Sequence, residues 1–235
     1  MKKTMSFTLF LLVVAYPIYC MSVKTIVDEM NARYTKIVER ADGIKITQVI
    51  KSISNGAEVS SVQNILKKGK RYRIETISQL QLDEEKTKNV ILFDGTNIWF
   101  ISPYVGITMM PKDEAMIHGI FDDFSKLIPL SSRISGEEKI NNEDCYIIKT
   151  PDDSDVPFKK IWVSQTRFVP LKATGMLSKK IITLIFTDYK KIEGIWGIPN
   201  KTETMIDNEL VATSTVETVE TDIDIANETF DIQSQ

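Results

Sequence analysis

The chain has 235 residues, of which 43% are hydrophobic and 26% charged, and its net charge is −3 at pH 7. That length is enough for one good hydrophobic core, and mostly-β domains of this size are commonly single. The mild acidity argues against a nucleic-acid partner, which would need a clustered basic surface.

Residues 1–20 have the layout of a secretory signal peptide. Lys2 and Lys3 precede an uncharged segment whose apolar core covers residues 7–15. This segment is too short to span a bilayer, which takes about 20 apolar residues. We therefore expect residues 1–20 to direct export to the periplasm and residues 21–235 to form a single domain.

Cys20 allows an alternative, in which its sulfur is acylated and holds the protein at a membrane. The residue before an acylated cysteine is normally small, whereas here it is Tyr19. The sequence therefore favours ordinary cleavage near Cys20 to Ser22. Only Cys145 then certainly remains, and one thiol cannot form an internal disulfide.

Apolar residues recur at three- and four-residue steps over residues 23–40, as at Val23, Met30 and Ile37. This spacing predicts an amphipathic helix that begins after Ser22 and ends at the Asp42-Gly43 pair.

From residue 44 the pattern changes to alternating β-branched residues separated by turn signals such as Asn55-Gly56 and Asp94-Gly95. This pattern predicts a meander of hairpins up to residue 101. Strands resume at residue 132 and continue to residue 218, for about ten or eleven strands in total, with residues 188–197 as a connection.

Residues 112–128 interrupt the strands with a second helical pattern, opened by Pro111 and closed by Pro129. Its apolar stripe consists of Met116, Ile117, Ile120, Phe121, Phe124, Leu127 and Ile128. A stripe of this length needs a surface to cover, so we expect this helix to lie over the sheet.

Catalytic and metal-binding patterns are absent from the sequence. The single histidine is His118, no set of His or Cys ligands suits zinc, and neither a Gly-x-Ser-x-Gly elbow nor a Gly-rich phosphate loop is present. We therefore expect no enzyme, no cofactor and no metal. A lipid hydrolase that uses His118 is an alternative.

One basic cluster stands out in this acidic chain. It consists of Lys67, Lys68, Lys70, Arg71 and Arg73. The sequence favours a solvated hairpin end, with a site for an anionic ligand as the alternative.

Three segments resemble LolA, the periplasmic carrier of outer-membrane lipoproteins, and its wider superfamily. Residues 94–105 read Asp-Gly-Thr-Asn-Ile-Trp-Phe-Ile-Ser-Pro-Tyr-Val, residues 70–75 read Lys-Arg-Tyr-Arg-Ile-Glu, and residues 187–199 hold a Tyr-x-x-Ile-x-Gly turn before Pro199. The order of helix, strands, inserted helix and strands is also similar, so the resemblance covers most of residues 23–232.

This resemblance implies an α+β, mostly antiparallel fold, namely an unclosed, curved half-barrel with a helical lid. It also implies a monomeric carrier that binds the acyl chains of a lipoprotein or lipid and takes them from a membrane-embedded donor to an acceptor, toward the outer membrane. Burial of an acyl chain under a lid contributes about 0.8 kcal/mol per methylene. The alternative is a membrane-anchored lipid receiver or envelope-stress sensor.

The resemblance further implies that ligand-binding residues lie in the strands around Trp99 and in the lid. They are Tyr72, Ile74, Leu92, Trp99, Ile101, Met109, Met116, Ile117, Ile120, Phe121, Phe124, Leu184 and Phe186. LolA holds its lid shut with an arginine from an early strand, and Arg73 is the best match to that position.

Overall fold

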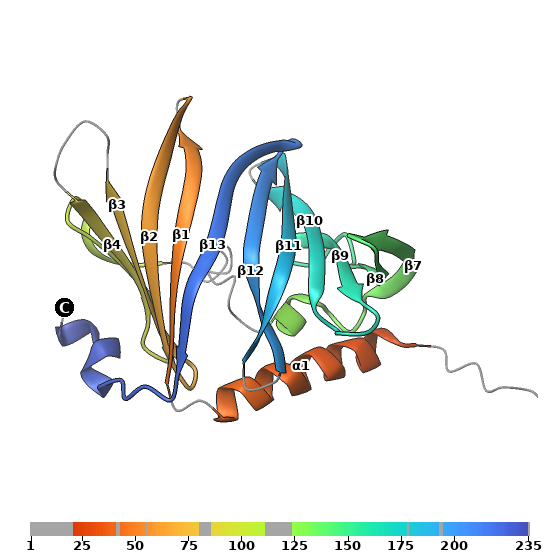
Figure 1. The fold of residues 1–235 in the computed structure, drawn as a ribbon, viewed down its shortest axis with the longest axis horizontal. Coiled ribbons are helices and arrows are strands. Elements are labelled where there is room, and N and C mark those ends of the chain that lie inside the picture. The colour runs from red at the N-terminus through yellow and green to blue at the C-terminus, as the bar shows by residue number, and fades with distance from the viewer. Residues whose placement is uncertain are drawn as a thin grey trace, which may run out of the picture.

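The computed structural model describes residues 21–40, 43–54, 56–79, 86–110, 124–177, 179–192 and 195–234. These residues form thirteen strands in one antiparallel sheet, which is curved but not closed into a barrel, and one α-helix (Figure 1). The predicted class, a mostly antiparallel unclosed half-barrel, is confirmed.

The first half of the sheet is a meander that grows outward from the middle of the sheet to one edge. Its strands are β1 (Ile44–Ser54), β2 (Ala57–Lys68), β3 (Arg71–Gln79), β4 (Lys86–Phe93), β5 (Ile98–Ser102) and β6 (Gly106–Met109). Each strand pairs with the next along the chain, so every link within this half is a local hairpin.

The second half starts at the opposite edge and returns to the middle. Its strands are β7 (Arg133–Ile140), β8 (Glu143–Lys149), β9 (Phe158–Ser164), β10 (Pro170–Leu177), β11 (Lys180–Ile192), β12 (Ile195–Ile206) and β13 (Glu209–Thr221). The last strand, β13, pairs with the first, β1, from Ile44 opposite Thr221 to Ser52 opposite Ala212. This central pairing joins the two halves.

The expected count of about ten or eleven strands was too low, since the described residues form thirteen, and two details of the strand pattern also differ. The sequence pattern does not predict the edge strand β6, because all four of its residues are exposed and it shows no burial alternation. The expected connection over 188–197 is mostly strand, since β11 continues to Ile192 and β12 starts at Ile195. A positive φ at Asp188 and a register shift between Lys190 and Lys191 disturb the alternation there.

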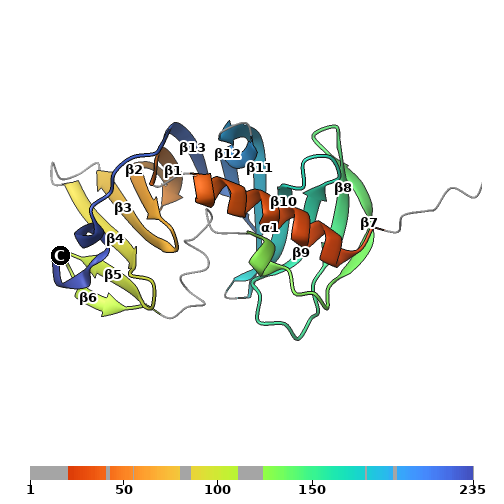
Figure 2. The same cartoon turned by 90° about the horizontal axis from the view of Figure 1, so that it is seen from below.

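The predicted first helix is confirmed as α1 (Val23–Arg40). Ser22 caps it by accepting a hydrogen bond from the backbone N–H of Thr25 at 3.1 Å. Figure 2 shows that α1 lies across the half of the sheet that holds β9 to β12. Its side chains Ile26 and Met30 are buried in the same apolar cluster as strand residues of this half.

Residues 111–123 of the expected second helix, and with them His118, lie outside the described residues. The chain continues from there into a short 3-10 helix, η1 (Phe124–Leu127). The ring of Phe124 packs against Phe158 and Phe186, in each case with 5.6 Å between ring centroids.

The chain after β13 covers the far face of the first meander, opposite the face that packs toward α1. It contains two further 3-10 turns, η2 (Asn227–Phe230) and η3 (Ile232–Ser234). Ile225 and Phe230 are buried there against Val90 and Leu92. We call residues 223–232 the C-terminal strap. Because the strap covers the far face, the first meander buries apolar side chains on both of its faces.

Part of the basic cluster holds this strap in place. Lys68 Nζ donates to the carbonyl oxygen of Ile225 at 2.7 Å, and Arg71 Nη2 donates to Asn227 Oδ1 at 2.7 Å. The Arg71 guanidinium also lies 5.0 Å from the ring centroid of Phe230. These two cations therefore have a structural role rather than forming only a solvated hairpin end.

Residues 1–20, with Cys20, lie outside the described residues, so the structure does not test the export prediction. Among the residues it describes, no helix is both long and apolar enough to cross a membrane.

Candidate functional site

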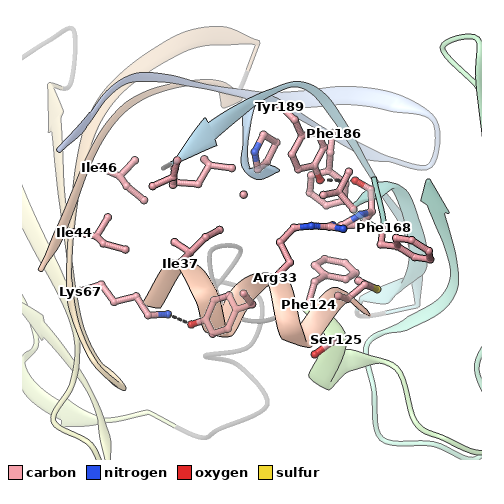
Figure 3. A pocket seen from close by; sticks show the side chains of 18 of the residues that line it. Arg33, Ile37, Ile44, Ile46, Lys67, Phe124, Ser125, Phe168, Phe186 and Tyr189 are labelled. Atoms are coloured by element: carbon pink, nitrogen blue, oxygen red, sulfur yellow. Dashed lines mark hydrogen bonds between the residues drawn. The ribbon is translucent and has the colours of Figure 1, made fainter. Parts of the chain in front are cut away.

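A cavity lies between α1 and the curved sheet, at the junction of the two meanders (Figure 3). Its empty space amounts to about 900 Å³, part of which belongs to its open mouth. The lining comes from α1, β1, β2, η1, the turn between β9 and β10, the start of β10, β11 and β12: Met30, Arg33, Tyr34, Ile37, Ile44, Ile46, Ile65, Lys67, Phe124, Ser125, Phe168, Val169, Pro170, Phe186, Tyr189, Ile192, Gly197, Ile198 and Pro199.

The strand side of the cavity is apolar because of the two-residue period of the sheet. Ile44 and Ile46 are two residues apart on β1, so they point to the same face, and Ile46 pairs with Ile65 of β2. All three side chains are at most 6% exposed. They give one wall of the cavity a continuous aliphatic surface.

The helix side of the cavity comes from the apolar stripe of α1. Met30, Arg33 and Ile37 are three and four residues apart, so they lie on one face of the helix. Ile37 approaches β12 closely, since a Cβ atom on Gly197 would lie 2.5 Å from its Cδ1 atom. Glycine at this position lets the helix lie near the sheet and narrows the cavity there.

Two cations reach this apolar space, and the described part of its lining includes no carboxylate. Lys67 Nζ donates to the hydroxyl of Tyr34 and lies 4.8 Å from the centroid of its ring. The Arg33 guanidinium extends from α1 toward Phe168, 6.0 Å from the ring centroid (Figure 3).

A polar network lies behind the Phe168 side of the cavity. Glu143 accepts a hydrogen bond from Arg167 Nε at 2.8 Å and further ones from Arg167 Nη2 and the Ser164 hydroxyl. The bond from Arg167 is the main reason that the pKa of Glu143 falls below its usual range. The Tyr189 hydroxyl donates to the carbonyl oxygen of Pro170, and burial raises the pKa of this phenol.

Arg33 differs from Arg167 in its surroundings. Burial is the main reason that the pKa of Arg33 is lowered, whereas the hydrogen bond to Glu143 raises the pKa of Arg167. A guanidinium remains charged even so, since its ordinary pKa is above about 12. The exposed carboxylate of Glu29 on α1 partly offsets this effect of burial, but the described cavity lining itself offers Arg33 no carboxylate.

The structure brings two of the predicted ligand-binding residues, Phe124 and Phe186, into the cavity lining. Tyr72 and Ile74 are buried in the apolar cluster that also contains the cavity residues Ile44, Ile46 and Ile65, while Leu184 is buried near Phe186. These five predicted residues lie on the side of the sheet that faces the cavity or the core next to it.

Four other predicted residues lie elsewhere. Leu92, Trp99 and Ile101 pack on the far face of the sheet in the cluster with the C-terminal strap. Met109 is 65% exposed on the edge strand β6. The Trp99 indole donates to Asp94 Oδ2 at 2.9 Å, so the LolA-like Asp-Gly turn holds this ring locally.

Arg73, the predicted lid latch, also lies on the far face of the sheet. Its Nε atom donates to Glu75 Oε1 at 2.8 Å, and its Nη1 atom is 3.5 Å from the carbonyl oxygen of Thr229 in the C-terminal strap. The predicted lid residues Met116, Ile117, Ile120 and Phe121 lie outside the described residues.

Apart from Phe124 and Phe186, the sequence prediction missed the whole described lining of the cavity, including Arg33 and the other α1 residues, the β1 and β2 residues with Lys67, and the residues around β10 and β12. Arg33 had a detectable signal, because a charged residue in the middle of an apolar helical stripe is unusual. Lys67 belongs to the basic cluster recognised in the sequence. The sequence does not show that Lys67 points to the cavity face of β2, whereas its neighbour Lys68 points to the strap. Among the described residues, no group of His, Cys, Asp or Glu could hold a metal ion.

Comparisons with known proteins agree with this fold. A family model described as an uncharacterized protein matches residues 122–234, which is less than half of the chain. No sequence among the curated proteins matches this chain.

Two solved structures resemble the chain over nearly its whole length. A DUF1329 family protein from Desulfovibrio piger is 16% identical with a TM-score of 0.67, and the alignment covers 90% of this chain and 98% of that one. A putative outer membrane lipoprotein-sorting protein domain from Vibrio parahaemolyticus is 14% identical with a TM-score of 0.65 and the same coverage. The predicted resemblance to the lipoprotein-sorting superfamily is thus confirmed at the level of the fold.

Proposed function

We propose that this protein is a non-catalytic carrier that binds the acyl chains of a lipoprotein or lipid in the cavity between α1 and the sheet. The observation that carries the proposal is the cavity itself, which is partly open to solvent and has largely aliphatic and aromatic walls. An apolar cavity of this kind suits an alkyl chain, because each buried methylene contributes about 0.8 kcal/mol. The fold shared with a putative lipoprotein-sorting domain favours the same class of cargo.

The proposal includes a location in the periplasm, with a membrane-embedded donor and acceptor for the cargo. The signal-like residues 1–20 support it. Intact-mass measurement of the exported protein tests this part directly. A free amine at residues 21–23 supports a diffusing carrier, and a diacylglyceryl group on Cys20 supports instead an anchored receiver or sensor with the same cavity.

Binding can be tested by native mass spectrometry of protein isolated from the envelope under mild conditions, and by titration with a fluorescent fatty acid. We expect bound lipid and saturable uptake of the probe. Absence of both would refute the proposed function.

A pair of variants on one strand locates the binding site. Ile46 is 4% exposed and lines the cavity, while Ile53, also on β1, is 58% exposed and lies outside it. We expect Ile46→Trp to weaken probe binding by at least about tenfold, because the larger ring occupies space that the chain needs. Ile53→Trp should leave binding unchanged, and equal effects of the two variants would place the site elsewhere.

A further inference from the structure

Arg33 occupies a position on α1 where an apolar residue is expected. Its neighbours on the same helix face, Met30 and Ile37, are 6% and 8% exposed and line the cavity. Figure 3 shows the Arg33 side chain extending from α1 across the cavity rather than along the outer surface of the helix. The sequence thus places a permanent cation inside a largely apolar binding space.

The described protein does not satisfy all the hydrogen-bond donors of this cation. Arg33 Nη1 is buried and has no hydrogen-bond partner among the described residues. The carboxylate whose charge raises the pKa of Arg33 belongs to Glu29, which is exposed on α1. The carboxylate of Glu143 is already bound by Arg167 through two nitrogens. The contact with the Phe168 ring, at 6.0 Å, satisfies none of the guanidinium N–H groups.

The second cation of the cavity has a different environment. Lys67 donates to the Tyr34 hydroxyl and lies over its ring, so the protein itself supplies it with partners. A buried donor without a partner is costly, and native proteins rarely keep one without a reason. A ligand group that accepts hydrogen bonds from Arg33 supplies such a reason.

We propose that the cavity binds an amphiphile with an anionic head, a carboxylate or a phosphate, which Arg33 holds while the alkyl chain lies against Ile37, Ile44 and Ile46. This inference rests on the proposed function and specifies its ligand. A guanidinium matches either anion with two parallel hydrogen bonds, which gives both charge and orientation. The uncharged ester and amide linkages of an acylated protein would leave the charge of Arg33 unmatched, so a free anionic lipid fits the site better.

The test compares ligands that share one chain and differ only in the head. Binding of dodecanoate, dodecyl phosphate and methyl dodecanoate is measured by calorimetry on the mature protein. We expect at least one of the two anions to bind about tenfold or more tightly than the ester. A gain of this size corresponds to one charge-assisted hydrogen bond between the head and Arg33. The two anions, compared with each other, distinguish a carboxylate head from a phosphate head.

Three variants then assign the preference to Arg33. Arg33→Gln should reduce anion binding by about tenfold and leave the ester within about twofold, while Arg33→Lys should retain much of the preference for anions. Lys36→Gln, at an exposed position of the same helix, is the matched control and should change neither.

The outcomes separate the two proposals. If none of the three ligands binds, the carrier function and this inference both fail. If the anions and the ester bind equally, or if Arg33→Gln weakens all three equally, the cavity binds chains but Arg33 does not recognise the head, and only this inference fails.

Discussion

Truncation of Phe230 to alanine tests whether the C-terminal strap is part of the core. The ring is 2% exposed, packs with Val90, Leu92 and Ile225, and lies 5.0 Å from the Arg71 guanidinium. Replacing such a phenylalanine by alanine costs about 3–5 kcal/mol, because the apolar contacts are lost and a cavity remains. With a urea m-value of about 2–3 kcal/mol/M, the unfolding midpoint should fall by about 1 M or more.

Urea unfolding followed by tryptophan fluorescence and by circular dichroism measures this loss. Leu210→Ala is the control, because Leu210 is 46% exposed on β13 and should change the free energy of unfolding by less than about 0.5 kcal/mol. A loss below about 1 kcal/mol for Phe230→Ala would refute the reasoning that the strap is a core element. The variant should also bind fatty-acid probes normally while folded, since Phe230 lies across the sheet from the cavity.

Three more predictions concern single side chains. Glu143→Gln should lower the free energy of unfolding at neutral pH. Because the pKa of Glu143 is lowered in the folded state, the difference in stability between the variant and the native protein should shrink as the pH falls below about 4.5. Urea unfolding at a series of pH values measures this difference. Burial raises the pKa of the Cys145 thiol to about 11, so Ellman's reagent at pH 8 should label the unfolded chain at once and the folded chain hardly at all. Arg33→Met should raise the thermal midpoint of the ligand-free protein by about 2–4 °C, because it removes a buried donor without a described partner; a lower midpoint would contradict this.

Hydrophobic periodicity was enough to predict α1 and most strands. The spacing over residues 23–40 matches the bounds of α1, and turn signals such as Asn55-Gly56 separate strands that do pair. Both signals are local, because they depend on which face of one element is buried. The edge strand β6 buries neither face, and for that reason it produced no signal.

The ligand-binding residues were harder to predict, because an apolar side chain does not reveal which surface covers it. β5 carries Ile98 and Phe100 on the cavity side and Trp99 and Ile101 on the side of the strap. Their alternation therefore could not distinguish the cavity face from the far face. The strap comes from residues more than a hundred positions later in the chain, so no window around β5 contains the information.

Arg33 illustrates the opposite case, in which a residue that breaks the pattern carries the information. The apolar stripe of α1 is evident in the sequence, but periodicity alone assigns no role to its one charged member. A charge that the helix geometry directs to the buried side must find a partner or serve a ligand.

The pairing of β1 with β13 has a consequence for how the molecule folds. Each meander consists of local hairpins that can form independently. The pairing of β1 with β13 instead closes a loop that contains most of the chain, and it therefore carries a large loss of chain entropy in a single step. We therefore expect the seam between β1 and β13 to form late. Because β1 and β2 line one side of the cavity and β11 and β12 the other, the binding space exists only after the seam has closed. A bound lipid would then contact both halves of the sheet and stabilise the pairing of β1 with β13 against opening.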